Sequence, residues 1–249
     1  MRTFLFAKRN TKEILRDHVN LFFSLGFPLV LLVLLSIINS AIPAEAKNTL
    51  FEINTLAPGL AMFGSVFMAL FAGMLLSKDR TSSFLMRLFT SPMTATDFIL
   101  GYTLPMIFMT TAQASITLLL AGAFGLDINI YIICGIIMTT LTSLLFVGTG
   151  LFFGSILNDK AVSGVCGALL TNIAGWLSGV FIPIDIIGGT FKKITNILPF
   201  YHSVETIRMS LTGDFNHLLP HLLIVTAYTV VVFALAIIVF NRKMNGEKA

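Results

Sequence analysis

Side chains that could carry acid–base or metal chemistry are few in this chain and lie far apart. No H-E-x-x-H pattern and no pair of carboxylates falls inside an apolar run, and the four histidines are scattered near interfaces: His18, His202, His217 and His221. Five aspartates also fall at or near the ends of apolar runs, where charge costs little: Asp79, Asp97, Asp127, Asp159 and Asp185. A Ser-His-Asp arrangement stays open, but no pattern favours an enzyme.

The sequence also lacks a recognisable nucleotide-binding loop. It has no G-x-x-x-x-G-K-[ST] loop, so it cannot bind the phosphates of ATP by that route, and we expect no cofactor in this chain. An ion-driven carrier usually has charge or unwound helices near the middle of the bilayer. The apolar runs offer no such charge. If the chain carries a solute across a membrane, the energy source therefore lies outside this polypeptide.

The most polar interior segment is "KDRTSSFLMRLFTSPMTATDFILGYTLP", from Lys78 to Pro105. Ser82 or Ser83 can cap a short helix that ends before Pro92. One face of this helix would be apolar and the other cationic, with these members: Phe84, Leu85, Leu88 and Phe89 against Arg80 and Arg87. An apolar ridge beside cations suits the groove of a partner protein, and a helix lying on the bilayer surface is the alternative.

The elements that must position this segment are membrane helices. The chain has 249 residues, of which 56% are hydrophobic and 11% charged, with a mean hydropathy of +0.90. A soluble protein of this size cannot hide so much apolar surface, so we predict an all-α membrane protein. Six apolar runs are long enough to span the bilayer: about Leu21–Ile42, Leu56–Leu76, Leu100–Phe124, Ile130–Gly154, Val162–Pro183 and Leu218–Phe240.

Lys and Arg predict the orientation of these spans. With the N-terminus in the cytosol, twelve cations fall on the cytosolic side and four outside: Lys47, Lys192, Lys193 and Arg208. Both termini are therefore expected in the cytoplasm, in a multi-pass protein of the cell membrane. The charged region before the first span is too long for a secretory signal.

Two further segments are predicted to be amphipathic. Residues 1–20 form an interfacial helix, in which Lys8, Lys12 and Arg16 make one cationic stripe near anionic lipid headgroups, while Phe4, Ala7, Ile14 and Leu15 lie largely elsewhere. Residues 184–217 are too apolar for a free loop and too broken for a span, so we expect two short re-entrant helices at the outer interface.

Small residues predict close helix contacts in two spans. Ala168, Asn172, Gly175 and Gly179 share one face of the fifth span, which is either a helix–helix seam or a seam that also borders a cavity. "GLFFG", from Gly150 to Gly154, is a second small-xxx-small element. The two cysteines, Cys134 and Cys166, lie in apolar runs and are expected to be packing residues.

The whole chain resembles the membrane subunit of an ABC exporter of the second type, the family that exports drugs, antibiotics, peptides and polysaccharides. Three features carry the resemblance in order: the basic N-terminal helix leading into "FPLVLLVLL", the Lys78–Pro105 segment, and "LSGVFIPID" followed by "LPFYHSVETIRMSLTGDF". The chain departs from the family at "KDR", where an acidic residue is more usual before the Arg or Glu pair. The resemblance therefore predicts where this loop lies, but not the details of its charge contacts.

The resemblance implies a single permease domain over residues 1–249, with a coupling loop at 77–97 that docks on an ATP-hydrolysing subunit. Residues at or near that contact would be Lys78, Asp79, Arg80, Phe84, Arg87 and Leu88. The turn "SILNDKA" would make a second, smaller contact through Asn158, Asp159 and Lys160. Two permease chains, as a homodimer or a heterodimer, would work with two ATPase subunits that hold ATP and magnesium, in a bacterial plasma membrane. No nucleic-acid partner is implied.

The resemblance also implies a substrate pathway along the second and fifth spans. It would be lined by a shared helical face of the second span and two residues of the fifth: Phe63, Phe67, Phe71 and Met74, with Asn172 and Trp176. These side chains suit an apolar or amphipathic cargo such as a drug, antibiotic or peptide, although ordinary packing explains the same stripe. The alternatives are a carrier or channel without a motor, export of a lipid-linked polysaccharide, a membrane enzyme and an assembly scaffold.

Overall fold

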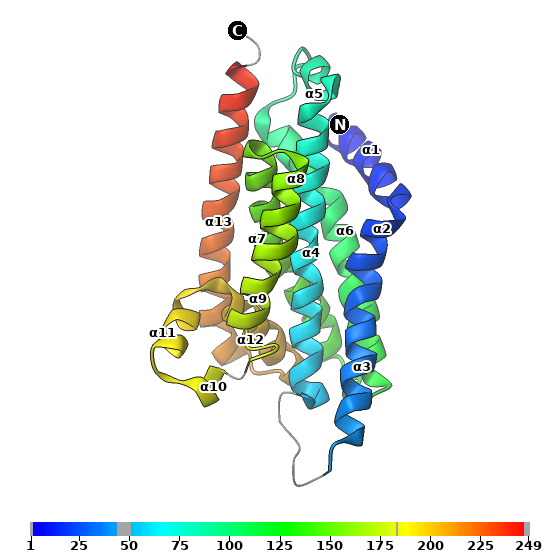
Figure 1. Ribbon diagram of the computed structural model, residues 1–249, viewed down its shortest axis with the longest axis vertical. Helices are drawn as coiled ribbons and strands as arrows, with labels where there is room; N and C mark the ends of the chain where they lie inside the picture. Colours follow the sequence, from blue (N-terminus) through cyan, green and yellow to red (C-terminus); the bar gives the residue numbers. More distant parts are fainter. Residues whose placement is uncertain (1, 44–50, 183, 247–249) are drawn as a thin grey trace.

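Long helices lie side by side in this computed structural model, which describes residues 2–43, 51–182 and 184–246 (Figure 1). The described residues contain no strand, so the all-α prediction is confirmed. The described ends of α1 and α13 lie at the same end of the bundle, together with α5 (Figure 1). The helices, in chain order, are α1 Arg2–Arg16, α2 His18–Leu21, η1 Phe22–Gly26, α3 Phe27–Ala41, α4 Ile53–Thr81, α5 Ser83–Leu88, α6 Ala95–Gly122, α7 Tyr131–Ile156, α8 Asp159–Val162, η4 Ser163–Leu170, α9 Thr171–Leu177, α10 Ile184–Ile187, α11 Gly189–Ile197, α12 Pro199–Thr212 and α13 Phe215–Gly246.

Five helices among the described residues are long and apolar enough to cross a membrane: His18–Ala41, Ile53–Thr81, Ala95–Gly122, Tyr131–Ile156 and Phe215–Asn245. The expected span at 162–183 is not among them, so the six-span layout is not confirmed. Helix there begins at Asp159, passes through the π-helical segment η4 and ends at Leu177. Gly179 follows with a φ of 83°, a left-handed conformation that favours glycine and turns the chain out of the helix. The apolar run therefore continues past the end of the helix.

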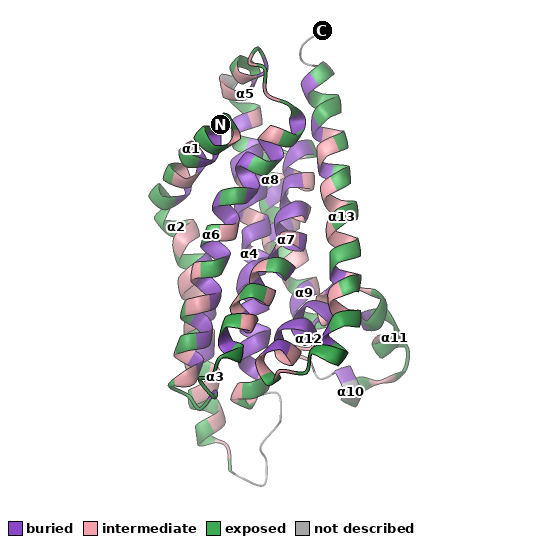
Figure 2. Ribbon diagram, turned by 180° about the vertical axis from the view of Figure 1, so that it is seen from behind, coloured by how far each residue is buried: buried purple, intermediate pink, exposed green. Residues whose placement is uncertain are grey.

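The helix α4 forms the centre of the bundle. Most of its residues are buried, whereas few residues of α13 and of the helix at 18–41 are buried, and both helices carry many exposed apolar side chains (Figure 2). Exposing apolar side chains to water is unfavourable, whereas exposing them to lipid tails carries no such free-energy cost. The burial pattern therefore agrees with a membrane bundle built around α4.

Glycines let α4 and α7 approach closely at the centre. A Cβ atom on Gly154 would lie 2.5 Å from the carbonyl oxygen of Gly73, and one on Gly73 would lie 2.7 Å from the carbonyl oxygen of Gly150. A Cβ on Gly150 would collide with the backbone of Ala69. The "GLFFG" element is thus part of the seam between α4 and α7, where backbone rather than side chains makes the contact.

The segment 184–217 contains α10, α11 and α12, and its re-entry into the bilayer stays a prediction. Pro199 stands at the first position of α12, which places its missing N–H where no helix bond is needed. Gly213 ends α12 with a φ of 75°. Most of α12 is buried, and His202 joins it to α11 and α13. Its Nε2 lies 2.9 Å from the carbonyl oxygen of Asn196 in α11, and its Nδ1 lies 2.6 Å from Nδ1 of His221 in α13.

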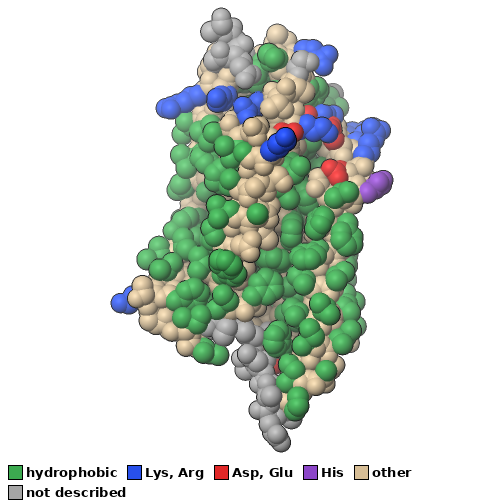
Figure 3. All heavy atoms as spheres, viewed as in Figure 1, with side chains coloured by type: hydrophobic (Ala, Val, Ile, Leu, Met, Phe, Trp, Pro, Cys, Tyr) green, Lys and Arg blue, Asp and Glu red, His purple; other side chains and the backbone are tan. Residues whose placement is uncertain are grey.

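The cations separate along the length of the bundle. Arg242, Lys243 and the described cations of α1, α4, α5 and α8 belong to one end, while Lys192, Lys193 and Arg208 belong to α11 and α12 near the other (Figure 3). Lys47 and Lys248 lie outside the described residues. The separation is the one that the positive-inside rule requires, and which end faces the cytosol stays a prediction.

The glycine seam predicts that two Gly→Ala substitutions differ in their effect on stability. We expect Gly150→Ala to lower the thermal midpoint of the detergent-purified protein, at a cost of about 1–3 kcal/mol, because its methyl group meets backbone that cannot move aside. Gly164→Ala is the control, since nothing lies within 4 Å of its Cβ position, and alanine there should be neutral or stabilising. Equal midpoints for the two variants would contradict the seam.

Candidate functional site

The sequence-predicted coupling segment is built at the end of α4. That helix continues to Thr81, past the expected end of the apolar span, so Lys78, Asp79 and Arg80 form its last turns. The side chain of Ser82 then caps α5 by accepting a hydrogen bond from the backbone N–H of Phe84. A capping box of Thr94 and Asp97 begins α6. The segment 77–97 is therefore a compact helix–turn unit.

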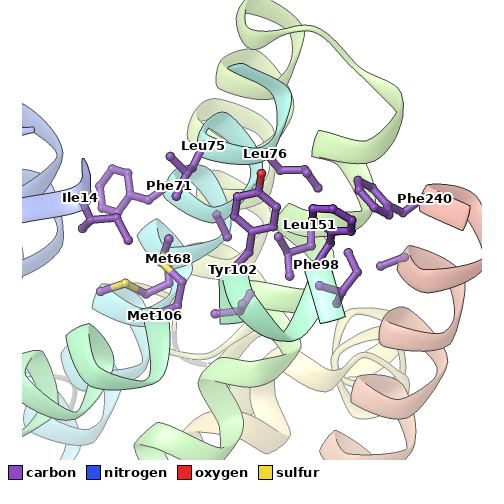
Figure 4. Packing of buried hydrophobic residues seen from close by; sticks show 14 of the residues in the cluster. Ile14, Met68, Phe71, Leu75, Leu76, Phe98, Tyr102, Met106, Leu151 and Phe240 are labelled. Carbon is purple, nitrogen blue, oxygen red and sulfur yellow. The ribbon is translucent and has the colours of Figure 1, made fainter. Parts of the chain in front are cut away.

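A buried carboxylate lies under this unit. Asp79 is only 3% exposed, and it receives two hydrogen bonds from the guanidinium of Arg9, one of them with an Nη2–Oδ1 distance of 2.9 Å. The hydroxyl of Tyr102 donates a third, 2.8 Å from Oδ2. Figure 4 shows Tyr102 among the packed side chains of α4, α6, α7 and α13. A charged carboxylate in such surroundings is tolerated only when it is paired and hydrogen-bonded.

Arg9 connects this carboxylate to three further groups. It bonds Glu13 one turn along α1, at 2.6 Å, and its guanidinium carbon lies 4.2 Å from the ring centre of Phe84 in α5. Glu13 in turn lies 3.7 Å from the ammonium of Lys78. Partial burial opposes the charge of Arg9, but its hydrogen bond to Asp79 and the negative charge there raise its pKa above the ordinary value. We call Arg9, Asp79 and Tyr102 the latch.

The latch is extended by contacts that dock α1 on α6. Phe6 packs edge-on against Phe98 and Tyr102, with ring centres 5.4 and 5.0 Å away. Asn10 donates from Nδ2 to the carbonyl oxygen of Gly101, 3.1 Å away, and Phe6 occupies the space that a side chain at Gly101 would need. The N-terminal helix is thus held by protein as well as by any lipid beside it.

Sequence reasoning missed this docking. It treated Phe4 and Leu15 as part of the apolar side of the helix, but both are exposed, and the buried residues of α1 are Phe6, Ala7, Asn10 and Ile14. The signal was a polar residue, Asn10, at helical spacing from Phe6 and Ile14. The three cations of the expected stripe, Lys8, Lys12 and Arg16, are all exposed as predicted.

The two predicted contact segments lie together. Arg80 donates from Nη2 to the carbonyl oxygen of Leu157, 2.7 Å away, and the hydroxyl of Ser77 lies 2.6 Å from Oδ1 of Asp159. The side chain of Asn158 caps α8 by accepting from the N–H of Ala161. The turn between α7 and α8 is therefore fixed to the same end of α4 as α5.

Burial divides the predicted contact residues into two groups. Lys78, Arg87, Asn158 and Lys160 are exposed, together with Met86 of α5, which sequence reasoning did not select. The second group is partly or fully covered by the chain itself: Asp79, Arg80, Phe84, Leu88 and Asp159. The first group can touch a partner, and the second holds the surface in place. We call the exposed group the docking face.

The predicted pathway residues do not form one lining. Phe63, Phe67 and Phe71 are buried: Phe63 meets Phe67 and Phe181, and Phe67 also packs against Phe23 and Phe27. Met74 is partly buried.

On α9, Trp176 is 53% exposed, and Asn172 is exposed with its amide donating to the carbonyl oxygen of Ala168. Between them Gly175 faces the ring of Phe63. The glycine makes the helix seam, and Asn172 and Trp176 point away from it, to the surface of the chain.

Comparisons with known proteins show which family the chain belongs to. The family model of the ABC-2 type transporter matches residues 1–212, which is most of the chain. Nodulation protein J of Rhizobium meliloti (strain 1021) is similar over 70 residues, with 33% identity. That match covers 28% of this chain and spans only 27% of the relative's length. The family match includes the latch, α5 and the turn at 157–160, and on that basis the chain belongs to the ABC-2 type transporter family.

Proposed function

We propose that this chain is the permease subunit of an ATP-driven exporter and that a separate ATPase subunit docks on the docking face. Membership of a transporter family makes it a membrane transport protein. The observation that carries the rest is the latch, which ties the docking face to α4, the most buried helix of the bundle. A push on α5 is thereby passed to the centre of the molecule.

The proposed mechanism uses differential packing and no chemistry in this chain. Two permease chains and two ATPase subunits form the transporter, with ATP and magnesium on the ATPase subunits. Closure of the ATPase pair on ATP moves the docking faces, and α4 moves with them because Arg9, Asp79 and Arg80 bind them to it. The cavity between the two permeases then changes from inward to outward access.

The cargo is proposed to be hydrophobic or amphipathic, such as a drug, antibiotic or peptide. Exposed Trp176 and Asn172 offer an aromatic surface with one amide to a cavity between two chains. Export of a lipid-linked polysaccharide is the second candidate, since the family that the chain belongs to includes exporters of polysaccharides as well as of drugs. A carrier without a motor is the third candidate, and it would transport without nucleotide.

Charge reversal on the docking face tests the partner. We expect Arg87→Glu with Lys160→Glu to abolish co-purification of an ABC ATPase subunit with this chain, because like charges at an interface are strongly unfavourable. Lys192→Glu with Lys193→Glu is the matched control, with two reversals in α11 at the other end. The measurement is the ATPase-to-permease ratio after affinity purification. Retention by the first pair equal to that of the control would refute the assignment.

Removal of the latch tests the transmission. Arg9→Met leaves the Asp79 carboxylate buried without its cation, and we expect a loss of about 3–5 kcal/mol of stability. Arg9→Met with Asp79→Leu removes both charges and should recover most of that loss. Arg16→Met, an exposed α1 cation outside the latch, should change little.

The double variant separates stability from coupling. It should still bind and stimulate the ATPase, yet lose the ATP-dependent change in labelling of a cysteine placed at Trp176, in a background with Cys134 and Cys166 replaced by alanine. Normal ATP-dependent labelling in the stable double variant would show that the latch only stabilises the fold.

A further inference from the structure

A cleft of about 1010 Å³ lies between the α1–α2 segment and α4. Its rim is polar and its floor apolar. The floor is formed by Phe71, Met74 and Leu75 of α4, and the rim by charged residues of α1, the following turn, the end of α4 and the start of α8. In Figure 3, Lys and Arg side chains gather over this end of the molecule, above a face covered by hydrophobic side chains.

The rim of the cleft is positively charged. Five Lys or Arg and three Asp or Glu line it, which gives +2 with His18 neutral: Lys8, Arg9, Lys12, Arg16 and Lys78 against Glu13, Asp17 and Asp159. Arg9 is already neutralised by Asp79, and Glu13 bonds Arg9 and lies near Lys78. In the described part of the chain, Lys8, Lys12 and Arg16 have no ion-pair partner within 4 Å. The free positive charge is therefore concentrated on the α1 side of the cleft.

The floor lies one helical turn below the rim. Met74 and Lys78 are four residues apart on α4, about 6 Å along the axis, so an occupant can touch an ammonium group and apolar side chains at once. Exposed Leu5 and Val19 add apolar surface to the lining of the cleft, and Phe22, outside the lining, is exposed as well. A ligand with an anionic head and a long apolar tail fits both parts, whereas an acidic peptide would leave its polar backbone against the apolar floor.

We propose that this cleft binds one anionic phospholipid per chain. Its phosphate lies among Lys8, Lys12 and Lys78, and one acyl chain lies over Phe71, Met74 and Leu75. The site differs from the general attraction of a basic helix to a membrane, because the lipid would touch α1 and α4 together and bridge the two helices that the latch joins. It does not depend on the identity of the exported cargo, and Lys78 is the one residue named for it that also belongs to the docking face.

Native mass spectrometry of the purified chain tests the site directly. The chain is exchanged into detergent and titrated with phosphatidylglycerol or phosphatidylcholine of the same acyl chains. We expect one tightly retained phosphatidylglycerol per chain and no comparable phosphatidylcholine. Lys8→Gln with Lys12→Gln should weaken retention about thirtyfold, since each cation near an anionic lipid contributes a factor of about five.

Arg242→Gln with Lys243→Gln is the matched control, because it removes two exposed cations from the same end of the bundle outside the cleft. It should retain the lipid as the unsubstituted chain does. Equal loss in both pairs would leave only unspecific attraction and overturn the site. All of these substituted side chains are exposed, and unchanged thermal midpoints in lipid-free detergent verify the fold.

A second measurement tests the apolar floor. Phosphatidylglycerol should raise the thermal midpoint of the unsubstituted chain, and soluble glycerol phosphate at the same concentration should not. Met74→Glu, which places a carboxylate on the partly buried floor, should remove the lipid's effect. Equal protection by glycerol phosphate, or full protection of the Met74→Glu variant, would refute a lipid site. Stronger retention of an acidic peptide than of phosphatidylglycerol would assign the cleft to a protein segment instead.

Discussion

The buried carboxylate of Asp79 is the constraint on which this end of the molecule depends. A charge so well covered by protein must be matched by a cation and hydrogen-bond donors, and the chain supplies them from Arg9 of α1 and Tyr102 of α6. The N-terminal helix α1 is thereby joined at one point to α4 and α6. Because α5 begins at Ser83, four residues after Asp79, and the ring of Phe84 packs against the guanidinium of Arg9, the orientation of the docking face follows from that junction.

Two kinds of contact hold α4 in the bundle, one in its apolar part and one at its charged end. In the apolar part, Gly73, Gly150 and Gly154 bring the backbones of α4 and α7 into contact, and dispersion forces between closely packed atoms are the main source of stability. At the charged end, ion pairs and carbonyl contacts replace them, as in the bond from Arg80 to Leu157. The first set of contacts joins α4 to α7, and the second joins α1, α5 and the turn at 157–160 to the same end of α4.

Much of the helical architecture could be predicted because it depends on local signals. The lengths of the apolar runs predicted the five long helices. Ser82 and Pro92 predicted where α5 begins and ends, and Gly213 predicted the end of α12. The latch could not be predicted, because Arg9 and Asp79 are 70 residues apart and the sequence around each residue gives no sign of which partner it binds. The pairing of Arg9 with Asp79 depends on how α1 docks on the bundle. That docking was hard to predict because the buried face of α1 contains the polar residue Asn10. The end of the helix at Leu177 was missed for a related reason: hydropathy does not report where Gly179 turns the backbone.

The central claim is that α1, α5 and the end of α4 move as one body while the surface of α9 moves relative to them. Spin-label distances in the assembled transporter test this most directly, with one pair at Lys12→Cys and Arg87→Cys and a second at Arg87→Cys and Trp176→Cys, in a background without Cys134 and Cys166. The account predicts that a non-hydrolysable ATP analogue leaves the first distance distribution unchanged and shifts the second. A shift of the first pair on nucleotide binding would contradict it, because α1 would then move independently of the face that receives the push.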